Sequence, residues 1–130
     1  MEKCRLYAPV IVRIGMSLVF LWFGFNQLVD SQSWLGWLPD WAYALPLGPL
    51  TLIFLNGLFE VILGGLLLAG LFTRIVAILL SLHLIGIAIA VGYNDVAIRD
   101  AGLSLATFSV FLQGPDMLCL DTKWRKREEE

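Results

Sequence analysis

The sequence predicts an all-α integral membrane protein built as a bundle of four transmembrane helices, and two observations lead to this class. The first is composition: hydrophobic residues make up 58% of the 130 positions and charged residues only 15%, whereas soluble domains have about 45–50% and about 25%. A soluble domain of this size lacks the interior to bury so many apolar side chains, and a disordered chain would be richer in charge. The second is that the apolar residues gather in four long runs.

Each apolar run is long enough to cross a membrane, because a hydrocarbon core of about 30 Å needs about 20 helical residues. We expect spans at about 7–29, 50–72, 75–93 and 96–113. The first run exceeds the apolar region of a signal peptide and no small-residue cleavage site follows it, so we expect a retained span. Pro115 ends the last span, since proline cannot continue a helix. Short connections make spans two, three and four antiparallel neighbours.

Lysine and arginine residues lie on one side of this topology. The stretch 30–48 has none, whereas the other side of the predicted membrane holds Lys3, Arg5, Arg74, Lys123, Arg125, Lys126 and Arg127. Positively charged loops stay in the cytoplasm, so we predict a multi-pass protein with both termini inside. We divide it into one membrane domain, residues 1–121, and a charged, frayed cytoplasmic tail, residues 122–130.

The connection between the first two spans is rich in aromatic residues, including Trp34, Trp37, Trp41 and Tyr43. Such rings gather at the level of the lipid headgroups. We expect an outer segment that lies along the membrane surface. A lid over an outward-facing pocket is the alternative interpretation, and the sequence alone leaves it open.

Polar side chains share faces of the predicted spans, and they are the candidates for a ligand-binding or proton-carrying site. The candidates are Glu60, Arg13, Arg99, Asn56, Gln27, Asp95 and His83. Glu60 lies roughly 15 Å from the outer end of its span, and a carboxylate left unpaired there is costly.

We therefore expect Glu60 to reach Arg13 or Arg99 and to form the functional site with Asn56 and Gln27. The alternative is a purely structural buried pair, or a protonated carboxyl that fixes helix register. Asp95 and Arg99, four residues apart, are predicted to form a local ion pair. For His83, an ordinary hydrogen-bonded histidine is favoured over a metal ligand.

Other classes of function lack support in the sequence. The net charge of −2 offers no basic surface for nucleic acid. We find no metal-ligand spacing, and no glycine-rich phosphate loop. Cys4 and Cys119 fall on the predicted cytoplasmic side, where thiols stay reduced, so we expect both to be free. A redox-active pair across the termini is the alternative.

Several motifs resemble those of the DoxX family of small four-span membrane proteins. They are the stretch from Arg13-Ile14-Gly15 to Phe20–Gly24, the block from Glu60 to Thr73-Arg74, Asn94-Asp95 with Arg99-Asp100, and the ending from Gly114-Pro115 to Asp121. The resemblance covers about residues 7–121. The chain differs at Asp116 and Met117, where glycine and a basic residue are usual, and at Cys119, where a small polar residue is usual.

This resemblance implies a four-helix bundle in the cytoplasmic membrane of a bacterium or archaeon. It also implies an accessory subunit of a quinone-linked redox system, such as thiosulfate:quinone oxidoreductase or a system that maintains redox homeostasis. In that role the chain would bind a quinone or a lipid in a polar intramembrane pocket, and would assemble as a homo-oligomer or with a redox subunit.

The enzymatic role stays open, because no motif for haem, flavin or an iron–sulfur cluster is present. The chain would be at most one subunit of a membrane oxidoreductase. The alternatives are a non-enzymatic assembly or chaperone protein, and a small-molecule transporter in which Glu60 carries a proton.

Overall fold

The computed structural model describes residues 1–129, which form helices and no strand. The four predicted spans correspond to four long helices, α1 (Glu2–Val29), α3 (Pro49–Ala69), α4 (Thr73–Val91) and α5 (Asp95–Gln113). Shorter elements connect and follow them: η1 (Ser31–Trp37), α2 (Asp40–Tyr43) and α6 (Leu120–Glu128). The all-helical class predicted from composition is confirmed.

Three of the long helices, α1, α3 and α4, are long and apolar enough to cross a membrane. The fourth, α5, has the same 19 residues as α4. Its first two turns carry Asp95, Arg99 and Asp100, which lower its hydropathy. Local chemistry sets its start, because the Asn94 side chain accepts a hydrogen bond of 2.9 Å from the backbone N–H of Ala97.

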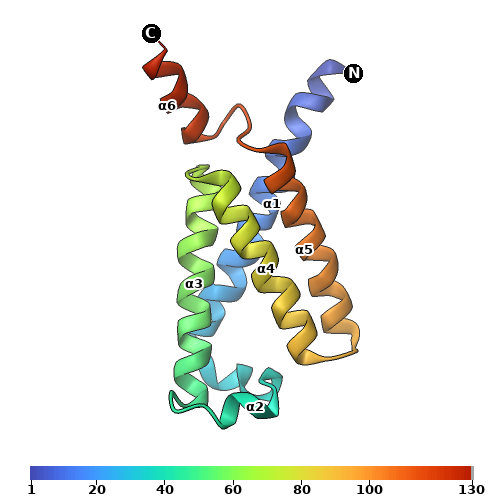
Figure 1. The fold of residues 1–130 in the computed structure, drawn as a ribbon, viewed down its shortest axis with the longest axis vertical. Helices are drawn as coiled ribbons and strands as arrows, with labels where there is room; N and C mark the ends of the chain where they lie inside the picture. Colours follow the sequence, from blue (N-terminus) through green and yellow to red (C-terminus); the bar gives the residue numbers. More distant parts are fainter. Residues whose placement is uncertain (130) are drawn as a thin grey trace.

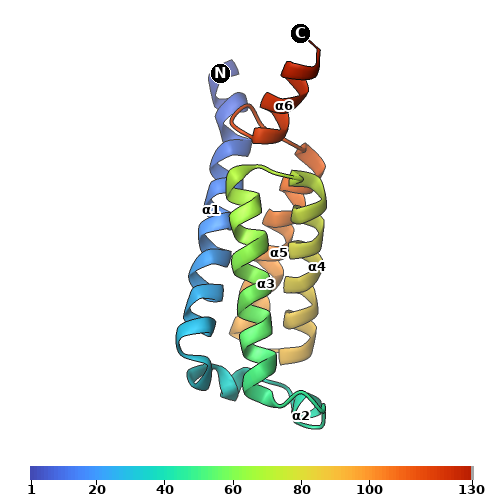
Figure 2. The same ribbon diagram turned by 90° about the vertical axis from the view of Figure 1, so that its left-hand side faces the viewer.

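The long helices associate as two pairs. Helix α1 packs along α3, and α4 packs along α5, while contacts between the pairs are fewer. Helices α3 and α4 meet at their short connection and diverge toward the opposite end, where η1 and α2 lie (Figure 1). Both chain ends lie at the end of the bundle where α3 and α4 meet, which we call the closed end, and there α6 and the first turns of α1 project beyond the bundle (Figure 2).

An apolar core fills the space between the pairs, with Phe20, Leu67, Leu80 and Val110 almost fully buried. Outward faces of the helices are apolar as well, and Ile11, Ile62 and Ile89 are all more than half exposed. Such faces are expected of helices that contact lipid. Small polar residues add hydrogen bonds between helices inside the bundle. Ser81 on α4 and Ser104 on α5 each donate a hydrogen bond to the other's carbonyl, at 3.0 and 2.8 Å.

Arg13 joins the closed end of the bundle to the segment after α5. Its Nε donates to Asp116 Oδ2 at 2.6 Å, and its Nη1 donates to the carbonyls of Leu67 and Leu68 at 2.9 and 2.5 Å. These carbonyls belong to the last turn of α3, where backbone acceptors lack helical partners. The expectation that Arg13 reaches Glu60 is therefore wrong, because Asp116 and the end of α3 use its donors.

The carboxyl group of Asp116 is held in its charged form by this contact. Burial by itself would raise its pKa, but the hydrogen bonds from Arg13 and from the backbone N–H of Leu118, together with the charge of Arg13, bring the pKa below its ordinary 3.8. The contribution of the charged Asp116 to the free energy of folding is complete above pH 3.8 and is lost as the pH falls below that value.

Helix α6, from Leu120 to Glu128, covers most of the predicted tail. Asp121 anchors it, since its carboxylate accepts from the backbone N–H groups of Phe72 and Thr73 at 2.9 and 2.8 Å. Its own N–H donates to the carbonyl of Gly70 at 3.0 Å. Cys119 lies buried beneath this contact and is free, as is the exposed Cys4. Burial raises the pKa of the Cys119 thiol.

We expect the Arg13–Asp116 pair to show the energetics of a buried ion pair. Asp116→Leu leaves the arginine charge without its partner and should cost about 3–5 kcal/mol in the free energy of unfolding. The double variant Arg13→Leu/Asp116→Leu should lose less than the two single losses added together. Unfolding in mixed detergent micelles measures both. Combining Arg13→Leu with Glu60→Leu is the control, and compensation there would contradict the pairing.

Candidate ligand pocket

A pocket of about 570 Å³ lies where the two helix pairs diverge. Every long helix contributes to its wall, and the segment containing η1 and α2 lies across it. The lining is largely aromatic and aliphatic and includes Phe20, Phe23, Leu52, Ile53, Leu84 and Leu103. A largely apolar, partly open space of this volume with a few converging polar groups is the usual form of a small-molecule site.

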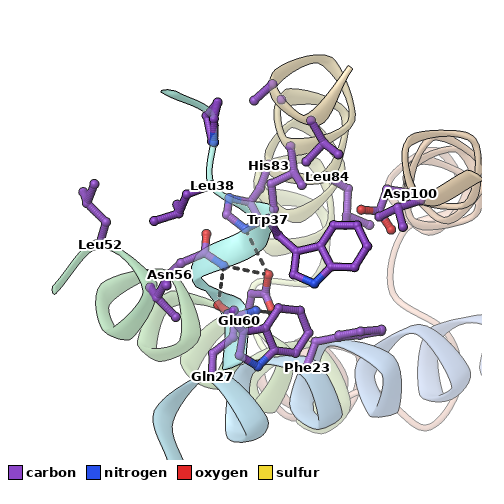
Figure 3. A pocket seen from close by; sticks show the side chains of 18 of the residues that line it. Phe23, Gln27, Trp37, Leu38, Leu52, Asn56, Glu60, His83, Leu84 and Asp100 are labelled. Carbon is purple, nitrogen blue, oxygen red and sulfur yellow. Dashed lines mark hydrogen bonds and ion pairs between the residues drawn. The ribbon is translucent and has the colours of Figure 1, made fainter. Parts of the chain in front are cut away.

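Glu60 lies at the centre of the polar cluster in this pocket, with 3% of its surface exposed. Its Oε1 accepts from Asn56 Nδ2 at 3.1 Å and lies 3.2 Å from His83 Nε2. Its Oε2 accepts from Gln27 Nε2 at 3.3 Å. Asn56 also donates to Gln27 Oε1 at 2.7 Å, which closes the cluster (Figure 3). Three helices, α1, α3 and α4, therefore meet through one carboxylate.

The partners of Glu60 differ from those predicted. Neither Arg13 nor Arg99 pairs with it, and His83 takes the place expected of an arginine. Arg99 instead lies 2.8 Å from Asp100 Oδ1 and stacks over the ring of Phe23 at 5.0 Å. The predicted Asp95–Arg99 pair is therefore wrong.

Asp100 is a pocket residue that the sequence analysis did not place among the candidates. It is 5% exposed and lines the wall opposite Glu60, on α5 (Figure 3). Its spacing with Ser104 and Thr107 was a usable signal, because all three are buried on one face of α5. The pocket thus has a carboxyl group on each side, one beside a histidine and one beside an arginine.

The aromatic connection contributes to the wall of the pocket. Trp34, Trp37 and Trp41 all line the cavity. Trp34 packs edge-on against Phe23, with ring centroids 5.7 Å apart. Within the connection, the Tyr43 hydroxyl donates to the carbonyl of Leu35 at 2.9 Å. The contact with Phe23 holds Trp34 against the pocket wall.

Two glycines set the spacing of the helices that carry Gln27 and Glu60. A Cβ atom on Gly24 would lie 2.8 Å from the carbonyl oxygen of Gly57, and a Cβ on Gly57 would lie 2.8 Å from that of Gly24. Backbones so close exclude any larger residue, as at other small-residue contacts between membrane helices. Gly24 faces Glu60 and Gly57 faces Gln27, since a Cβ on either glycine would lie 2.9 Å from the Cβ of the facing residue. The close approach of the two helices therefore brings Gln27 and Glu60 within hydrogen-bonding distance.

A model of a known protein family matches this chain. Residues 8–93 match the family model described as DoxX. The chain belongs to the DoxX family. It is accordingly an integral membrane protein. The region matched to DoxX covers Gln27, Asn56, Glu60 and His83, and ends before α5 begins. Comparisons with curated proteins and with solved structures find no match.

We expect alanine at Gly57 to separate α1 from α3 and to weaken the Gln27–Glu60 hydrogen bond. Its Cβ meets backbone, which cannot rotate away, so the loss should be about 1–3 kcal/mol in the free energy of unfolding. The matched control is Gly65→Ala in the same helix, whose Cβ meets nothing within 4 Å. That variant should be neutral or slightly stabilising. Equal losses in the two variants would contradict the close packing.

Proposed function

We propose that the chain crosses the cytoplasmic membrane four times, with both termini inside. Support for α5 as the fourth span comes from its length, which equals that of α4, and from its outward side chains, since Leu105 and Leu112 are 70% and 62% exposed. The two chain ends lie at the same end of the bundle (Figure 1). Lysine and arginine gather at that end, which favours a cytoplasmic location.

We further propose that the pocket binds a quinone-type molecule, and that the chain is an accessory subunit of a quinone-linked redox system. The observation that carries this proposal is the buried Glu60 cluster inside an apolar cavity of about 570 Å³. A quinone has a flat ring with polar oxygens and an apolar tail. The ring suits a space walled by aromatic side chains, and its oxygens suit the polar cluster.

The hydrogen-bonding inventory of the cluster favours the reduced, dihydroxy form of the ring. Asn56 uses both amide hydrogens on Gln27 and Glu60, Gln27 directs one N–H toward Glu60, and His83 Nε2 lies 3.2 Å from Glu60 Oε1. At this cluster the group left for a ligand is mainly an acceptor, the carboxyl group of Glu60, while the donors of the lining, Arg99 and the indole N–H groups of Trp34, Trp37 and Trp41, lie outside the cluster. A hydroquinone donates two O–H groups, whereas a quinone can only accept.

The rival interpretations differ in what the pocket should contain. In an assembly or chaperone protein the polar cluster serves helix packing, and no saturable binding of quinone is expected. In a proton-coupled transporter Glu60 and His83 exchange protons with a cargo of another class. Binding of quinone analogues therefore separates the proposed function from both.

We expect decylubiquinol to quench the tryptophan fluorescence of the detergent-solubilised protein in a saturable way, because three of the five tryptophans line the pocket. Decylubiquinone should bind about tenfold more weakly, since it has no O–H group to donate to the carboxyl oxygens of Glu60. Glu60→Gln should reduce that preference.

A pocket-filling variant supplies the control for this experiment. Gly86 lines the pocket and has open space where its Cβ would be, so Gly86→Leu should fold and abolish quenching. Gly102→Leu, placed in similarly open space outside the pocket lining, should bind normally. Non-saturable quenching that is alike in all variants would contradict the proposed function.

A further inference from the structure

A second cavity, of about 300 Å³, lies at the closed end of the bundle, far along the helices from the ligand pocket. Arg74 and Arg125 both line it, together with Phe72, Ile75 and Thr122. Neither arginine forms an ion pair within residues 1–129. The cavity therefore brings together two guanidinium groups that have no ion-pair partner among residues 1–129, one from the start of α4 and one from α6.

The contact made by Asp121 explains why these two arginines meet. Asp121 docks α6 onto the turn before α4, and Arg125 follows four residues later on the same face of α6. Asp121 also lines the cavity, but its oxygens accept from Phe72, Thr73 N–H and the Thr73 hydroxyl, the last at 2.9 Å. The carboxylate oxygens of Asp121 are therefore occupied by donors of Phe72 and Thr73, and they form no ion pair with Arg74 or Arg125.

The same turn presents an apolar surface beside the arginines. Phe72 has a positive φ of 50°, which is rare for a large side chain, and the hydrogen bond from its N–H to Asp121 holds it there. Phe72 and Ile75 are consequently 61% and 60% exposed at the rim. A cationic cavity bordered by exposed apolar side chains, at the end of membrane-spanning helices, matches an amphiphile with an anionic headgroup.

We propose that this cavity binds the phosphate of an anionic phospholipid. Arg74 and Arg125 contact the phosphate oxygens, and the acyl chains lie along Phe72 and Ile75. Guanidinium groups suit this role because their planar N–H donors match phosphate oxygens in pairs. The site is independent of the quinone pocket, and it couples lipid binding to the docking of α6.

The test is native mass spectrometry of the full-length protein in a neutral detergent, titrated with phosphatidylglycerol or phosphatidylcholine. We expect tight binding of one phosphatidylglycerol and weaker binding of phosphatidylcholine. Arg74→Gln/Arg125→Gln should weaken phosphatidylglycerol binding by about tenfold or more, because two charged hydrogen-bond donors are lost. Lys123→Gln/Lys126→Gln removes the same charge from α6 outside the cavity lining and should bind as the unchanged protein does.

Two results would overturn the proposal. Equal weakening in the arginine and lysine variants would mean that binding follows net charge and not this cavity. Displacement of phosphatidylglycerol by millimolar inorganic phosphate would assign the site to a free anion instead of a lipid. Thermal unfolding of each variant checks that a loss of binding does not reflect loss of fold.

Discussion

The buried carboxylate of Glu60 is the constraint on which the pocket end of the bundle depends. A carboxylate among apolar helices must find donors, and this one takes them from Gln27, Asn56 and His83. Hydrogen bonds to this one carboxyl group therefore hold the helices α1, α3 and α4 together at one point. The close approach of Gly24 and Gly57 makes the α1–α3 part of that meeting possible.

The opposite end of the molecule is held by different chemistry. There Arg13 and Asp116, and Asp121 with the turn before α4, join the chain after α5 to the ends of the other helices. One end is thus closed by ion pairing and backbone capping, while the other opens into a cavity beneath the tryptophans. This difference lets the helix pairs diverge at the pocket without separating along their whole length.

Much of the fold could be predicted from the sequence, because the composition and the length of each apolar run depend directly on the thickness and apolar character of the membrane. The four long helices and the gathering of Gln27, Asn56 and Glu60 follow from hydropathy and helical periodicity. The ion pairs could not be predicted from hydropathy and periodicity. Depth along a span suggested Arg13 and Arg99 as partners of Glu60, but Asp116 and Asp100 take them. Asp116 lies 103 residues from Arg13 in an irregular segment, where no periodicity predicts direction.

We propose that the Glu60 pocket holds a quinone-type molecule in the cell. The most direct measurement is native mass spectrometry of the protein purified from its own membrane in a mild detergent, with identification of the small molecules released. We predict an isoprenoid quinol or quinone bound at about one per chain, and its loss from Gly86→Leu but not from Gly102→Leu. Purified protein that carries only phospholipid, with identical content in both variants, would contradict the account.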